Sequence, residues 1–211
     1  MKLNSELRAQ ARQELAGNWV QPVVATLVYF FASLALSFSI GLIPFAGPIA
    51  TNLFGIMPLA YGFMLVFLGF IRGDKTFSMS KLFDGFKDYT RTLTIVLLVF
   101  IFTFLWTLLL IVPGIIKMYS YSMTYYISKD KPELSADECI NESMRLMDGN
   151  KMKLFLLDLS FIGWVLLAIL TGCIGFLWLV PYMQTARACF YEDLIANDTQ
   201  QKEEIIVEVV A

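Results

Sequence analysis

The sequence contains no histidine, only three cysteines and few charged residues. The absence of histidine excludes the usual zinc and di-metal ligand sets and every histidine-dependent catalytic triad. Cys139, Cys173 and Cys189 are too few and too scattered for a disulfide framework. No Gly-rich phosphate loop, nucleophile elbow or metal-ligand cluster occurs. We therefore expect no cofactor, no metal and no enzymatic activity.

Charge is scarce overall and absent from two long stretches. Charged residues make up 16% of the chain and hydrophobic residues 57%, whereas about 25% of a soluble domain is charged. No charge occurs from Gln21 to Ile71 or from Thr92 to Ile116. Since one membrane helix needs about 20 apolar residues, the pattern predicts a membrane protein rather than a large soluble core. The net charge of −2 and the lack of a dense basic patch argue against nucleic-acid binding.

The N-terminal residues 1–18 show the pattern of an amphipathic helix. Leu3, Leu7, Ala11 and Leu15 recur at four-residue spacing, and Gly17 suits the position just past a helix end. Two arrangements remain open. The helix either lies on the membrane surface or packs on neighbouring loops.

Six transmembrane helices in three hairpins are expected, each hairpin preceded by an amphipathic surface helix. The turns are expected at 44–48, at Val112-Pro113-Gly114 and at 172–175, with a kink at Pro58. The expected helices cover residues 20–43, 49–71, 92–111, 115–128, 154–171 and 176–195, and residues 197–211 form a flexible acidic tail.

Two further surface helices are expected between the hairpins. In the basic stretch 72–91, Leu82, Phe83, Phe86 and Tyr89 lie on one helical face. In the second charged stretch, residues 129–153, Ser135 and Glu138 have the spacing of a capping box. This box starts a helix that ends at Gly149.

The charge distribution supports six crossings. This count puts all of the 16 Lys and Arg residues except Lys117 on the side of the two termini. By the positive-inside rule that side is the cytoplasm. We therefore expect a multi-pass membrane protein with both termini in the cytoplasm.

The three hairpins suggest an internal repeat within one membrane domain, residues 1–196. Gly17, Gly85 and Gly149 each follow an expected surface helix, and a turn follows each glycine at a similar distance. The units would be 1–71, 72–128 and 129–196. Chance is the alternative, because Gly and Pro punctuate most helical membrane proteins.

Two groups of residues are candidates for a site. Asp158 and Arg187 lie at similar depth in the last predicted hairpin and would form an intramembrane ion pair. The pair would serve either structure or transport and binding. Lys117, Tyr119, Tyr121 and Tyr125 would line a polar cavity beside the helix at 115–128; the alternatives are helix packing and interface anchoring for the tyrosines and snorkelling for Lys117.

Several short pieces resemble one family. They are Ala11-Arg12 with Gly17-Asn18-Trp19, Leu82-Phe83-Asp84-Gly85-Phe86, Val112-Pro113-Gly114-Ile115-Ile116-Lys117, Ser143-Met144-Arg145-Leu146-Met147 with Gly149-Asn150-Lys151, Leu159-Ser160-Phe161-Ile162-Gly163-Trp164, and Pro181-Tyr182 with Phe190-Tyr191. With these the sequence resembles the bacterial integral membrane family called domain of unknown function 975. The resemblance implies a bacterial inner-membrane protein and supplies no catalytic residues.

The expected function is non-enzymatic. The chain would sit in the lipid bilayer and act through lipids or an unidentified membrane protein partner. The alternative is a small permease or channel, with a path near the helix at 115–128 and the Asp158–Arg187 pair.

Overall fold

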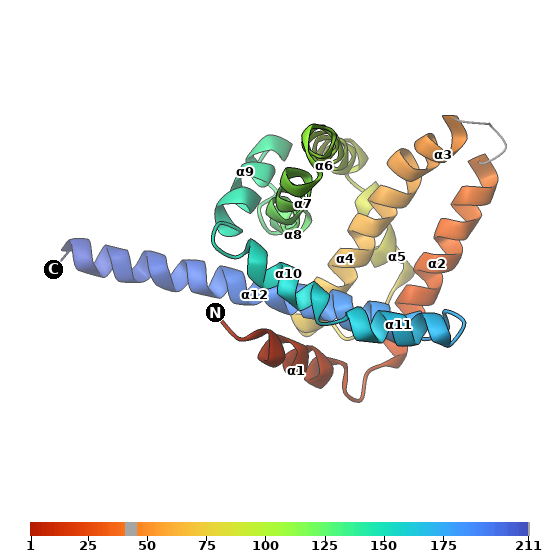
Figure 1. Ribbon diagram of the computed structural model, residues 1–211, viewed down its shortest axis with the longest axis horizontal. Helices are drawn as coiled ribbons and strands as arrows, with labels where there is room; N and C mark the ends of the chain where they lie inside the picture. The colour runs from red at the N-terminus through yellow and green to blue at the C-terminus, as the bar shows by residue number, and fades with distance from the viewer. Residues whose placement is uncertain (41–45, 211) are drawn as a thin grey trace.

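The computed structural model describes residues 1–40 and 46–210, and this part of the chain is helical without β-strands. The all-α prediction is therefore confirmed. The elements, shown in Figure 1, are α1 (Asn4–Leu15), α2 (Val20–Ile40), α3 (Ala46–Thr51), the π-helix η1 (Asn52–Ile56), α4 (Met57–Ile71), α5 (Met79–Leu82), the 3₁₀-helix η2 (Phe83–Phe86), α6 (Tyr89–Leu109), α7 (Ile111–Ser120), α8 (Thr124–Asp130), α9 (Ala136–Leu146), α10 (Lys151–Leu159), α11 (Ile162–Leu170) and α12 (Phe176–Val210).

Four helical stretches among the described residues are long and apolar enough to cross a membrane. They are Val20–Phe38, Asn52–Ile71, Tyr89–Leu109 and Lys151–Leu170. They correspond to four of the six predicted crossings. The stretches predicted at 115–128 and 176–195 are not among them.

The first part of α12 lies among the other helices, and its distal part projects beyond them (Figure 1). This helix packs against α1, α2, α4, α9, α10 and α11. The residues Ala186, Ala188, Cys189, Phe190 and Tyr191 are at most 1% exposed. A helix that is covered on all sides at mid-length belongs to the protein core.

The predicted end of this last helix near Ile195 is wrong, because α12 continues as one helix to Val210. The tail predicted at 197–211 is therefore helical in its described part. Its Asp198 is held by a cation from α9, which gives this segment a contact that composition alone does not reveal.

The N-terminal helix α1 packs lengthwise on α12, in the opposite direction (Figure 1). The terminal amine donates to Asn197, the Lys2 amide donates to Asp193, and the Tyr182 hydroxyl donates to the carbonyl of Arg8. Leu7, Ala11 and Leu15 are fully buried. The amphipathic pattern is thus confirmed, but protein rather than lipid covers the apolar face.

The second predicted hairpin differs in detail. The chain breaks at Leu110, which is extended, and Pro113-Gly114 lie in the first turn of α7 rather than in the predicted turn. Proline is tolerated in a first turn because that N–H needs no partner. A Cβ at Gly114 would lie 2.3 Å from the Thr107 hydroxyl, so glycine permits the close packing of α7 on α6.

The single helix predicted at 115–128 is also wrong. It is divided into α7 and α8 by a turn at residues 121–123. The Ser143 hydroxyl of α9 donates to the Ser120 carbonyl and accepts from the Met123 amide. A side chain from another helix therefore satisfies the backbone groups that the break exposes.

In place of the surface helix predicted at 72–91, the structure has only the short helices α5 and η2. Both of them pack on α4. A Cβ at Gly62 would lie 2.0 Å from the Leu82 carbonyl oxygen, and one at Gly85 2.2 Å from that of Pro58. Gly85 is thus a close-approach glycine and not the helix end that was predicted. Gly17 and Gly149 do have the positive φ of helix ends.

The kink predicted at Pro58 takes the form of the π-helix η1 just before it. Proline cannot donate to the carbonyl four residues earlier, and the free Phe54 carbonyl instead accepts from the Tyr89 hydroxyl. The predicted turn at 44–48 lies partly outside the described residues, which resume at Ala46.

In the third predicted unit, residues 129–196, the Ser135–Glu138 capping box is confirmed. The helix predicted at 154–171 is divided into α10 and α11 at Ser160-Phe161, where the Ser160 hydroxyl donates to Leu157. The turn predicted at 172–175 is confirmed between α11 and α12. The three-fold repeat stays a prediction.

Candidate functional site

Asp158 in the last turn of α10 meets Arg187 of α12. The Arg187 Nε and Nη2 atoms donate to the two carboxylate oxygens at 3.0 and 2.8 Å. The Tyr119 hydroxyl of α7 donates to the same carboxylate at 3.2 Å. The exposed fractions are 16% for the Asp158 side chain and 36% for that of Arg187. This two-point pairing neutralises both charges inside the fold.

This ion pair borders a cavity of about 240 Å³, which we call the tyrosine cavity. Tyr119, Tyr121 and Tyr125 line it as the sequence suggested. Lys117 does not, since its ammonium lies 5.1 Å from the Trp106 ring centroid and 3.7 Å from the Met144 sulfur. The remaining wall consists of Met64, Val99, Thr103, Met118, Ser122, Met123, Tyr126 and Leu154.

A larger groove of about 600 Å³ lies between α1 and the α11–α12 hairpin, and we call it the α1 groove. Arg8 and Arg12 of α1 form one side, with Trp19 just after the helix. The other side is mainly apolar and is formed by Trp164, Leu167, Ala168, Thr171, Gly175, Trp178, Leu179 and Tyr182. Of the chain's 4 tryptophans, all except Trp106 line this groove.

The two arginines of the α1 groove are without carboxylate partners among the described residues. The nearby carboxylates bind elsewhere: Glu6 accepts from the Leu3 amide, and Glu14 pairs with Lys75. The Nε atom of Arg8 is buried and has no hydrogen-bond partner in the described part. A buried donor without an acceptor is unfavourable by about 1–3 kcal/mol.

Sequence reasoning missed the α1 groove. It placed this helix either on the membrane surface or against neighbouring loops, and it did not relate Arg8 and Arg12 to residues far along the chain. One signal was available: their four-residue spacing puts both on one helical face, beside the apolar face that docks on α12.

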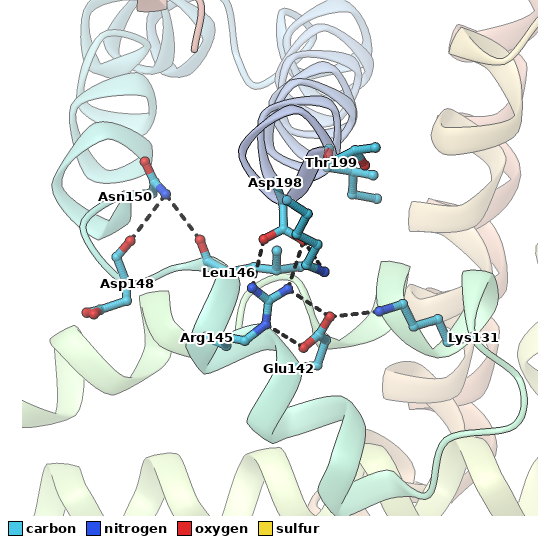
Figure 2. A network of polar contacts seen from close by, with 10 residues as sticks. Lys131, Glu142, Arg145, Leu146, Asp148, Asn150, Asp198 and Thr199 are labelled. Atoms are coloured by element: carbon cyan, nitrogen blue, oxygen red, sulfur yellow. Dashed lines mark hydrogen bonds and ion pairs between the residues drawn. The ribbon is translucent and has the colours of Figure 1, made fainter. Parts of the chain in front are cut away.

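A network of charges joins α9 to the distal part of α12 (Figure 2). The Arg145 guanidinium donates to both oxygens of Asp198 and of Glu142, and Lys131 donates to Glu142 at 2.7 Å. The hydrogen bonds from Arg145 are the largest cause that lowers the pKa of Glu142 to about 2. Arg145 likewise lowers the pKa of Asp198.

The cysteines and acidic residues offer no cluster of three potential metal ligands in the described ranges 1–40 and 46–210. Cys139 and Cys189 are buried and Cys173 is exposed, and all three are free thiols.

A family model described as "Protein of unknown function (DUF975)" matches residues 1–120 and 107–198. The two matches together cover nearly the whole chain and all three regions described above. No curated protein and no solved structure matches the chain significantly.

Proposed function

Because the chain belongs to the DUF975 family, whose function is unknown, we propose a function from its own geometry. The protein is a membrane protein that acts without catalysis by binding a lipid or a protein partner. The observation that carries this proposal is the α1 groove, which combines a mainly apolar wall with two unpaired arginines. No carboxylate or thiol lines it, which favours binding over general acid–base or nucleophilic chemistry.

The setting we propose is the bacterial inner membrane. Four apolar helical stretches support membrane insertion. The six predicted crossings would pair α2 with α3–α4, α6 with α7–α8, and α10–α11 with α12. Contacts between α2 and α4 and between α6 and α7 support the first two pairs. The third pair conflicts with the α1 groove, because Thr171 and Gly175 near its turn lie beside Trp19 at the start of α2. An even number of crossings keeps both termini on the basic, cytoplasmic side.

The test is to extract the full-length protein from native membranes with a polymer that retains surrounding lipid. Lipids and proteins in the preparation are then quantified by mass spectrometry against an unrelated multi-pass protein with the same tag. We expect one lipid class, or one protein at fixed stoichiometry, to be enriched. A composition equal to that of the control would contradict the proposal.

A second candidate, a small permease or channel, is favoured by the tyrosine cavity. Its polar wall includes Tyr119, Asp158 and Arg187. The test is a cysteine at Ser122, a lining residue, in a variant without the native cysteines. Labelling by a polar maleimide from both sides of the membrane would support a path, and labelling from one side or neither would oppose it.

A further inference from the structure

We propose that the α1 groove is a binding site for an anionic glycerophospholipid. The lipid phosphate would lie between Arg8 and Arg12, and an acyl chain would lie along Trp164, Leu167 and Trp178. This inference rests on the proposed function and specifies the ligand of the same groove.

The charge of the groove determines the head group. Arg8 and Arg12 are one helical turn apart, so their charges repel each other unless an anion lies between them. Neither has an ion-pair partner among the described residues, and the buried Arg8 Nε has no acceptor. The two non-bridging oxygens of a phosphate diester can accept a bidentate pair of hydrogen bonds from one arginine and a further hydrogen bond from the other, which would give both side chains an anionic partner.

The side-chain nitrogen atoms that line the groove are all donors, and its two hydroxyl groups already donate within the protein. The Tyr182 hydroxyl donates to the Arg8 carbonyl, and the Thr171 hydroxyl donates to Ala168 while it accepts from the Gly175 amide. The other polar groups in the side chains of the groove are arginine and tryptophan N–H groups, which cannot accept hydrogen bonds. The matching ligand must therefore supply acceptors, as phosphate does.

The opposite wall indicates a lipid rather than free phosphate or an acidic peptide. Trp164, Leu167 and Trp178 are 56%, 55% and 51% exposed, so the wall is open to an acyl chain over its length. It continues into the exposed apolar surface of α11, where Leu170 is 81% exposed. Tryptophan is favoured at the boundary between head groups and acyl chains, and three surround this groove.

The tryptophans also provide the measurement. In a Trp106→Phe variant, every remaining tryptophan lines the groove. This protein is reconstituted in nanodiscs of phosphatidylcholine that contain a small fraction of phosphatidylglycerol with brominated acyl chains, which quench tryptophan fluorescence on contact. Brominated phosphatidylcholine at the same fraction measures contact with the bulk bilayer. We expect the anionic lipid to reach half-maximal quenching at a fraction about tenfold lower than brominated phosphatidylcholine does. This preference is what two arginines near an anionic head group would produce.

Three variants in the same background act as controls. Arg8→Gln with Arg12→Gln should abolish the preference, and Arg8→Lys with Arg12→Lys should retain part of it. Lys87→Gln with Lys129→Gln removes two exposed charges elsewhere and should leave the preference unchanged. Size-exclusion profiles and thermal unfolding show whether each variant is folded.

The outcomes separate the two proposals. If the preference persists in the glutamine variant, the Arg8–Arg12 site is overturned but lipid binding survives. Equal quenching by both lipids in the parent protein would overturn the lipid site, and an enriched protein partner in native membranes would then still support the proposed function. Reversal of quenching by millimolar inorganic phosphate would show a free-anion site and overturn the choice of a lipid.

Discussion

Arg145 of α9 binds Asp198 of α12 through two hydrogen bonds, Nη1 to Oδ1 at 2.7 Å and Nη2 to Oδ2 at 2.9 Å. This contact attaches the distal part of α12 to the body of the protein (Figure 2). Lys202 also pairs with Asp198, but from within the same helix at 2.8 Å. The attachment between the two helices therefore depends on Arg145.

Replacing Arg145 with Gln should free the distal part of α12. We expect proteolysis within residues 197–210 to accelerate several-fold while the melting temperature of the body changes little, because exposed ion pairs contribute only about 0–1 kcal/mol. Limited proteolysis followed by mass spectrometry measures this. Lys202→Gln is the matched control and should have a smaller effect. Equal cleavage rates in Arg145→Gln and the parent protein would refute the attachment.

Acid should release the same segment. The pKa of Glu142 falls from its ordinary value of 4.5 to about 2 in the folded protein, and Asp198 also has a lowered pKa. Stability from a lowered carboxylate pKa is complete above the unfolded-state pKa and is lost as pH falls through the folded-state pKa. Because Asp198 makes the contact between the two helices, release should develop as pH falls below its ordinary pKa of 3.8, as measured by pepsin cleavage after residue 195. In Arg145→Gln, cleavage should already be high above that pH; a transition identical to the parent's would contradict this.

The Asp158–Arg187 pair should behave as a coupled unit. Asp158→Asn or Arg187→Gln alone leaves the partner charge unpaired, which in a fully buried pair is unfavourable by about 3–5 kcal/mol. Because the Arg187 side chain is 36% exposed, we expect about 2 kcal/mol for each single variant. The double variant should recover most of the loss, as read from thermal unfolding in detergent. Additive losses would show that the two residues do not depend on each other.

The contact between α4 and α5 should not tolerate a methyl group at Gly62. A Cβ there would meet the Leu82 carbonyl oxygen at 2.0 Å, whereas one at Gly69 of the same helix meets nothing within 4 Å. We expect Gly62→Ala to lose about 1–3 kcal/mol of stability by overpacking and Gly69→Ala to be nearly neutral. Similar melting temperatures for the two variants would contradict the observed packing.

Local signals in the sequence predicted much of the fold. The four-residue spacing in α1, the Ser135–Glu138 cap, the positive φ of Gly17 and Gly149, and the turn after α11 all depend on residues close in the chain. The features missed depend on distant partners. The break before α8 is stabilised by Ser143 of α9, and Gly85 is required by the Pro58 carbonyl.

The candidate sites divide in the same way. The shared depth of Asp158 and Arg187 within one predicted hairpin was enough to suggest that they meet. The α1 groove could not be predicted, because Arg8 and Arg12 acquire their apolar neighbours only when α1 docks along α12. The course of α12 beyond Ile195 likewise depends on a cation from another helix.

The arrangement of the α1 groove at the cytoplasmic side of the membrane can be tested most directly at Cys173. This thiol is exposed in the turn between α11 and α12, while Cys139 and Cys189 are buried. The groove places this turn beside Trp19, so with a cytoplasmic N-terminus a membrane-impermeant maleimide should label the protein only after permeabilisation, and Cys173→Ser should abolish the signal. Labelling of Cys173 in intact cells would contradict the arrangement, because the turn would then face away from the cytoplasm.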